Sequence, residues 1–236
     1  MTVTSGASFL AGPIAPDSIA TVFGKNLTTD TMAPSGDAPA LPTKLGSTTV
    51  TIQDSRGVSR LALLYYVSPT QVNFLVPPTT ALGMAKVSVT APNGVTAAQV
   101  NIFNTAPGLF TANTAGLAAA VGVHVQDGVQ SIFNVSYPDP VVGANLPVAI
   151  NLGAKNDQVF LTLFGTGIRN VSSLDRVTVL FNGVFGPVSY AGVQSEFAGL
   201  DQINVQMPQS LAGSGKVTIQ VTVDGVAANP VFVAVQ

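Results

Sequence analysis

Period-two alternation of apolar and polar residues is the feature of this sequence that most restricts its fold. It runs through three segments rich in Val, Ile and Thr: KVSVTAP (86–92), RVTVLFNG (176–183) and KVTIQVTVDG (216–225). Such alternation places one residue class on each face of a β-strand. Turn-forming residues separate these runs, as at Asn182-Gly183 and Asp224-Gly225. No long run has the 3.6-residue period of an amphipathic helix, so the sequence predicts an all-β chain of β-sandwiches.

Four segments of the first half recur in the same order in the second half. The pairs are SIATVFGKNL (18–27) with VFLTLFGTGI (159–168), STTVTIQ (47–53) with DRVTVLFNG (175–183), QVNFLVP (71–77) with QINVQMP (202–208), and AKVSVTAPNGVTAAQVNIF (85–103) with GKVTIQVTVDGVAANPVFVAV (215–235). An ordered set of matches indicates two copies of one fold unit, and 236 residues suit two ordinary domains. We therefore expect two tandem sandwiches, over residues 1–104 and 105–236.

The repeated heptads QVNFLVP and QINVQMP show how each strand divides between its two faces. Alternation predicts core positions at Val72, Phe74, Val76, Ile203, Val205 and Met207. The opposite face then carries Gln71, Asn73, Gln202 and Asn204. We interpret these amides as a structural motif that hydrogen-bonds a neighbouring loop or the backbone, because the motif occurs once in each repeat. A carboxamide platform for sugar is the alternative.

A Phe-Gly pair ends an apolar strand in each repeat, at Phe23-Gly24 and at Phe164-Gly165. We expect each phenylalanine to pack inward and each glycine to permit a bulge or a positive φ. A phosphate-binding loop would need richer glycine spacing and a following helix, and neither is evident.

Composition excludes several classes of function. Charged residues are only 8% of the chain, against about 25% in typical soluble proteins. The formal net charge is −2 and there is no basic cluster, so nucleic-acid binding is not expected. The most apolar run, LAAAVGV (117–123), is too short to span a membrane. Cysteine is absent, which excludes disulfides and thiolate metal sites.

The sequence contains few of the residue combinations that form catalytic sites. His124 is the only histidine, Asp127 is its near neighbour, and no G-x-S-x-G motif precedes a helix. We predict no catalytic residues, no cofactor and no metal site, and the chain is not expected to be an enzyme. A calcium site assembled from Asp residues of several loops stays open as an alternative.

The segment AGVQSEFAGLDQ (191–202) is an insertion that the first repeat lacks. It contains Glu196, Phe197 and Asp201, which we take as a candidate partner-binding loop because rigid sandwiches often carry recognition on loops. The alternatives are an exposed loop with ordinary solvated charges, or a pair of catalytic carboxylates.

Five segments together resemble the motif set of an uncharacterised module found at the C-termini of large exported proteins of acidobacteria and similar soil bacteria. They are ASFLAGPIAPDSIATVFGKNL, LYYVSPTQVNFLVP, APGLFTANTAG, VFLTLFGTGIRN and LDQINVQMP. The opening segment and the Phe-Gly strand end also resemble the immunoglobulin-like IPT/TIG domain. The resemblance covers about residues 6–236 and departs at Asp17, where the family motif usually has glycine.

The resemblance implies two immunoglobulin-like sandwiches in a secreted or cell-surface setting, with no established catalytic residues. We therefore expect a non-enzymatic structural, adhesive or spacer module of an exported bacterial protein. Its expected partners are other domains of that protein, surface proteins or glycans, and self-association is included. A carbohydrate-binding module for neutral polysaccharide is the alternative. The N-terminal sequence lacks a signal peptide as written, and we expect Met1 to begin a piece of a longer exported chain.

Overall fold

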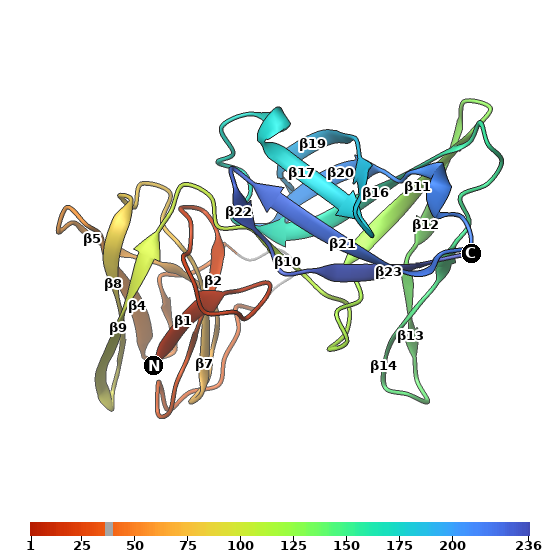
Figure 1. Cartoon of the computed structure of the whole chain (residues 1–236). Helices are drawn as coiled ribbons and strands as arrows, with labels where there is room; N and C mark the ends of the chain where they lie inside the picture. Colours follow the sequence, from red (N-terminus) through yellow and green to blue (C-terminus); the bar gives the residue numbers. More distant parts are fainter. Residues whose placement is uncertain (36–39) are drawn as a thin grey trace. The chain divides into compact units, whose positions relative to one another are not determined.

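The chain folds almost entirely into β-strands. A computed structural model describes residues 1–35 and 40–236, in which the only helices are two three-residue 3-10 turns, η1 (Leu174–Arg176) and η2 (Gln209–Leu211). Figure 1 follows the strands from the N-terminus to the C-terminus. The predicted all-β fold class is confirmed. The chain divides into two compact units, residues 1–106 with 195–200, and residues 107–194 with 201–236.

The first unit consists of two sheets around one core. One sheet has the order β1 (Thr2–Ser5), β2 (Ile19–Phe23), β7 (Gln71–Leu75) and β6 (Leu63–Val67). The other has the order β3 (Lys44–Leu45), β4 (Thr48–Gln53), β8 (Gly83–Ala91) and β9 (Gly94–Ile102), with β5 (Ser59–Leu61) on β4. Val22 and Phe74 from the first sheet and Val50 and Val87 from the second belong to the same buried cluster. The two sheets therefore face each other as layers of a sandwich.

The second unit has the same layered construction with additional strands. One sheet has the order β12 (Val129–Asn134), β11 (Ala120–Gln126), β16 (Gln158–Thr166), β20 (Asp201–Gln206) and β19 (Val188–Val193), with β10 (Gly108–Leu109) on β16. The other has the order β15 (Ala149–Ile150), β23 (Val231–Val235), β21 (Gly215–Val223), β17 (Val177–Phe181) and β18 (Val184–Gly186), with β22 (Val226–Ala227) on β21. A separate hairpin pairs β13 (Ser136–Asp139) with β14 (Ala144–Pro147).

Corresponding repeat segments occupy corresponding positions in these sheets. The order β4, β8, β9 in the first unit matches β17, β21, β23 in the second, and β2, β7, β6 matches β16, β20, β19. The six core positions predicted from the heptads, Val72, Phe74, Val76, Ile203, Val205 and Met207, are all buried. The alternation of the heptads thus predicted which face of β7 and β20 is buried.

Tight turns connect several of these strands. Asn182-Gly183 joins β17 to β18 with φ values of 48° and 85°, and Asp224-Gly225 joins β21 to β22 with 49° and 82°. Two successive positive φ values are typical of a type I′ turn, which suits the twist of a hairpin. Both turns lie where the sequence predicts them.

Asp17 also has a positive φ, of 60°. Its amide donates to the Val76 carbonyl at 3.0 Å, which ties the turn before β2 to the end of β7. Glycine adopts this left-handed conformation without strain and Asp tolerates it better than most residues. The departure from glycine at this position is therefore compatible with the turn.

The described residues contain no helix with the length and apolarity needed to cross a lipid bilayer.

We expect Phe181→Ala to lower the free energy of unfolding of the second unit by about 3–5 kcal/mol, because Phe181 is fully buried and truncation leaves a cavity. Urea denaturation followed by circular dichroism measures this change. Phe185→Ala is the matched control, since Phe185 lies on the adjacent β18 and is exposed, and should change stability by no more than about 0.5 kcal/mol. Equal losses in both variants would contradict the assigned core.

Candidate functional site

The amides of the first heptad form a side-chain network across two strands. Asn73 Oδ1 accepts hydrogen bonds from Thr21 Oγ1 on β2 at 3.0 Å and from Gln71 Nε2 at 2.9 Å. Strand register explains the geometry, because Thr21 lies directly opposite Asn73. Tyr66 on β6 is the partner of Asn73 on the other side, next to a bulge that makes Tyr65 an extra residue.

The second unit repeats this network with the corresponding residues. Asn204 Oδ1 accepts from Thr162 Oγ1 on β16 at 3.1 Å and from Gln202 Nε2 at 3.1 Å. Thr162 lies opposite Asn204, and Tyr190 on β19 is the partner of Asn204 on the other side, next to a bulge at Ser189. From the sequence, these amides were expected to bond a loop or the backbone. Their network partners are instead side chains of the same strand and of the neighbouring strand.

The surroundings of the two networks differ. In the network of the first unit, Thr21 is fully buried. Residues 195–200 also belong to this unit, and Ala198 O accepts a hydrogen bond from the Tyr65 hydroxyl. Gly199 in this segment packs closely on the same sheet, since an added Cβ would lie 2.5 Å from Leu75 Cδ1 and 2.8 Å from Ile19 Cγ1.

The network of the second unit opens into a shallow hollow on the outer face of its sheet. The hollow has a volume of about 190 Å³ and is lined by Val123, Val125, Gln130, Phe160, Thr162, Ser189 and Asn204. All seven lining residues are uncharged, so the hollow combines hydroxyl and amide groups with apolar walls. Such a surface can hydrogen-bond a neutral polar ligand.

The Phe-Gly pairs differ from the sequence expectation in both residues. Phe23 lies opposite Gln71 and Phe164 opposite Gln202, so both rings share the outer face with the amides. The inward positions are taken by Val22 and Leu163, because adjacent residues of a strand face opposite ways. Phe23 packs edge-on against Phe9, with ring centroids 5.5 Å apart.

Gly24 and Gly165 are needed for close approach, since neither has a positive φ. A Cβ at Gly24 would lie 2.7 Å from Leu27 Cδ2, and a Cβ at Gly165 would lie 2.6 Å from the Gly108 carbonyl oxygen. The glycines therefore make room for the neighbouring chain.

The three residues proposed for a binding loop separate in the structure. Glu196 and Phe197 are exposed in the segment that belongs to the first unit. Asp201 is instead fully buried at the start of β20, so we correct its assignment to an exposed loop. The alternation that makes Ile203 and Val205 inward-facing also turns Asp201 inward.

Asp201 is held by a set of donors in the second unit. Its Oδ2 accepts from the amides of Ile168 at 2.7 Å and Arg169 at 3.2 Å, and its Oδ1 accepts from Arg169 Nε at 2.7 Å. Burial raises the pKa of the Asp201 carboxyl, against the opposing effect of the Ile168 amide and the Arg169 guanidinium. These bonds fix the turn after β16 to β20, which is a structural role.

Asp54 has a similar structural role at a different position in the first unit. Its carboxylate accepts from the amides of Arg56 at 2.9 Å, Val58 at 3.1 Å and Ala81 at 3.2 Å, and pairs with Arg60 at 2.6 Å. Burial acts to raise the pKa of Asp54, but these amides and the Arg60 guanidinium together hold the pKa at about 2.

His124 pairs with Asp157 rather than with its sequence neighbour Asp127. His124 Nε2 lies 3.0 Å from Asp157 Oδ2, which also accepts from the Ala154 amide at 3.0 Å. Gln209 Nε2 donates to the Asp157 carbonyl at 2.8 Å. Within the described part of the chain no hydroxyl hydrogen-bonds His124, so the pair does not assemble the nucleophile of a catalytic triad.

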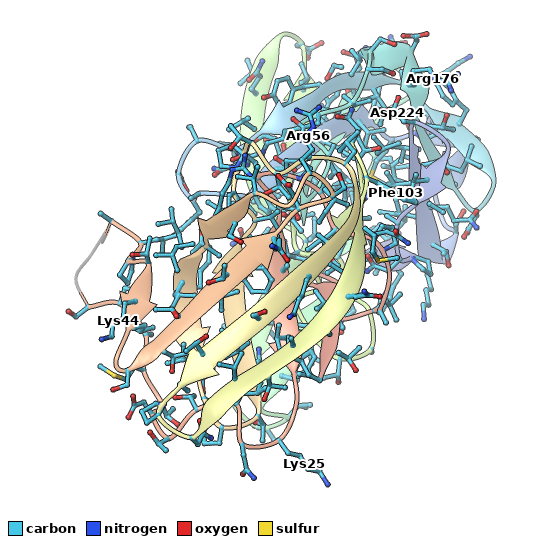
Figure 2. All side chains as sticks on the ribbon, turned by 90° about the vertical axis from the view of Figure 1, so that its left-hand side faces the viewer. Lys25, Lys44, Arg56, Phe103, Arg176 and Asp224 are labelled. Atoms are coloured by element: carbon cyan, nitrogen blue, oxygen red, sulfur yellow. The ribbon has the colours of Figure 1, made fainter. Side chains whose placement is uncertain are left out.

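No group of three or more His, Cys, Asp or Glu residues that could hold a metal ion occurs among residues 1–35 and 40–236. Lys25 and Lys44 of the first unit are exposed, and Figure 2 shows their side chains pointing outward. The strongest candidate site is therefore the uncharged hollow beside Asn204.

Comparison with known proteins found no matching family model and no significant match among the curated proteins.

We expect Asp201→Ala to lower the free energy of unfolding by about 3–5 kcal/mol, because it removes one partner of a buried ion pair and an acceptor for two amides. Glu196→Ala is the control from the same insertion and should cost no more than about 1 kcal/mol, as expected for an exposed charge. Thermal unfolding monitored by circular dichroism compares the two. A mild Asp201→Ala effect, close to that of the control, would contradict the structural role.

We expect stability to fall as the pH drops from about 4 towards 2, and Asp54→Asn to flatten the profile in that window. The folded-state pKa of Asp54, about 2, lies below its ordinary value of 3.8. Its contribution is therefore fully present above the ordinary value and lost as the carboxylate is protonated in the folded protein. Urea denaturation at a series of pH values tests this. A profile equally steep in wild type and variant would rule Asp54 out as the source.

Proposed function

We propose that this chain is a non-enzymatic structural or adhesive module of an exported or cell-surface bacterial protein, and that it associates with further copies of itself. Two immunoglobulin-like copies of one fold unit would build it. The matching strand orders of the two units and the family resemblance support this proposal. The exported setting is supported by the resemblance alone.

The observation that carries the proposal is the exposure of apolar side chains along β12 and the β13–β14 hairpin. The most exposed are Val129 (71% exposed), Ile132 (77%), Val141 (92%) and Val142 (62%). They lie within one continuous stretch of chain, residues 129–147. Exposed apolar side chains on an edge strand and at a hairpin tip are available to contact another protein.

The backbone geometry of this region favours association by strand addition. β12 is the edge strand of its sheet, and no described strand pairs with its outer side. An exposed, uncharged edge strand presents free amides and carbonyls to a partner strand. VQSIFN contains no charged residue that would discourage pairing with a second copy.

The hairpin tip has a defined conformation in which its apolar residues are presented outward. Asp139 Oδ1 accepts from the amides of Val141 at 2.8 Å and Val142 at 2.9 Å. Asn145 on β14 is connected to the loop before β11, donating to Ala112 O at 2.8 Å and accepting at its carbonyl from Asn113 at 2.7 Å. An ordered tip loses less conformational entropy on binding than a flexible one.

A non-enzymatic role is supported by the use of the ionisable side chains. Asp54 and Asp201 hold backbone amides and an arginine, and His124 is bonded to Asp157. Each of these groups joins neighbouring segments of its own unit.

The test is light scattering after size-exclusion chromatography over a range of protein concentrations. Wild type should rise from the monomer mass of 24.0 kDa towards multiples of it, and a Val141→Asp, Val142→Asp double variant should remain monomeric. Charges at the tip would have to be desolvated on association, which is unfavourable.

Val95→Asp is the control, because Val95 is also an exposed valine (66%) but lies on β9 of the first unit. It should associate as wild type does. A wild-type protein that stays at the monomer mass throughout, or a control that is equally impaired, would overturn the proposal.

A further inference from the structure

The hollow beside Asn204 has the chemistry of a ligand site. It lies on the outer face of the sheet that contains β11, β16, β20 and β19, away from the buried cluster of the second unit. Its polar lining comes from Gln130, Thr162, Ser189 and Asn204, and its apolar lining includes Phe160. With no charged group in its lining, the hollow cannot pair with an ionised ligand.

The network fixes the orientation of the Asn204 amide. Because Oδ1 accepts from both Thr162 and Gln202, the oxygen is directed into the network and the Nδ2 group away from it. No described acceptor takes a hydrogen bond from Nδ2, and no buried polar side-chain atom among the described residues lacks a partner. Nδ2 is therefore accessible and offers its two hydrogens to a ligand in the hollow.

The neighbouring hydroxyls present the complementary function. Thr162 Oγ1 donates its only hydrogen to Asn204, so towards a ligand it can act only as an acceptor. Ser189 Oγ likewise donates to the Asn204 carbonyl, at 3.4 Å. The hollow thus contains both donors and acceptors, which suits hydroxyl groups that both give and accept a hydrogen bond.

Tyr190 supplies a fixed aromatic ring just outside the lining of the hollow. It is the strand partner of Asn204, and its hydroxyl donates to the Val193 carbonyl at 2.8 Å. The tip of the ring rests over Gly192, where an added Cβ would lie 2.9 Å from Oη and 3.2 Å from Cζ. These two contacts hold the ring in one position. Because Tyr190 is 39% exposed, part of the ring stays open to solvent.

We propose that this hollow binds a neutral polysaccharide. The apolar face of a sugar ring would pack on Phe160, and its hydroxyls would bond Asn204 Nδ2, Thr162 and Ser189. A further sugar unit of the same chain would reach Tyr190, which lies outside the lining as the strand partner of Asn204. The ligand class follows from the absence of charge in the lining, the presence of both donors and acceptors, and the aromatic ring of Phe160 among them. Gln130 lines this hollow and also lies on β12, but Val141 and Val142, which the association test replaces, are not part of its lining. The two proposals are therefore tested at different residues, and either can fail alone.

The chain provides its own matched control in the first unit. Asn73 accepts from Thr21 and Gln71 in the same way as Asn204 accepts from Thr162 and Gln202. Thr21, however, is fully buried, whereas Thr162 lines the hollow. Substitutions at Asn73 and Asn204 therefore disturb equivalent networks, but only the second should affect a ligand in this hollow.

The experiment is native gel electrophoresis of the full chain through gels containing soluble mixed-linkage β-glucan, xyloglucan, galactomannan, dextran or polygalacturonate. At least one of the four neutral polymers should retard wild type, and polygalacturonate should not. Asn204→Asp keeps the oxygen that accepts from Thr162 and Gln202 but removes the Nδ2 donor. Asn204→Asp and Tyr190→Ala should each weaken the apparent Kd at least tenfold.

Asn73→Asp should stay within twofold of wild type, and circular dichroism should show that every variant is folded. The proposal is overturned if no neutral polymer retards wild type, if polygalacturonate is bound instead, or if Asn73→Asp and Asn204→Asp lose binding equally. It is also overturned if Asn204→Asp acts only by abolishing the association of the protein with a second copy, because the face would then be a protein interface.

Discussion

Burial of one face of each paired strand is the interaction on which this structure depends. Inward-facing side chains are fully buried between the two sheets of each unit, such as Val22 and Phe74 in the first and Leu161 and Ile219 in the second. Each large side chain of this kind contributes about 1.5–3 kcal/mol when removed from water. Since only 8% of the residues are charged, surface ion pairs contribute little, and the period-two pattern accounts for most of the fold.

The second requirement is that polar groups displaced from water find partners, and the units meet it in two ways. Buried carboxylates bond backbone amides and an arginine, as Asp54 does with Arg60 and Asp201 with Arg169. Amide side chains on the outer faces bond a threonine across the strand pair, as Asn73 and Asn204 do. These polar groups are therefore positioned by strand register, which is why the same network appears once in each unit.

Residues whose position follows from alternation were predictable from sequence, as the buried heptad positions and the Asn-Gly and Asp-Gly turns show. The prediction that Phe23 and Phe164 pack inward was wrong, because it rested on their hydrophobicity alone. Phe23 pairs with Gln71 and Phe164 with Gln202, and residues paired across two strands lie on the same face of the sheet, which here is the outer face. Asp201 lies two residues before Ile203 on the same strand, so its side chain is on the same, inward face. The pairing of His124 with Asp157 and the hollow beside Asn204 could not be predicted, because both depend on side chains that strand pairing brings together from distant segments.

The short segment Ser195–Leu200 belongs to the first unit although the second half of the sequence encodes it. During synthesis, residues 1–106 leave the ribosome well before this segment does. Until it arrives, Ile19 and Leu75 lack the neighbour that Gly199 supplies, and the Tyr65 hydroxyl lacks the carbonyl of Ala198. A fragment that ends near Ala106 would keep that deficit permanently, so the N-terminal half is expected to be incomplete when it is produced alone.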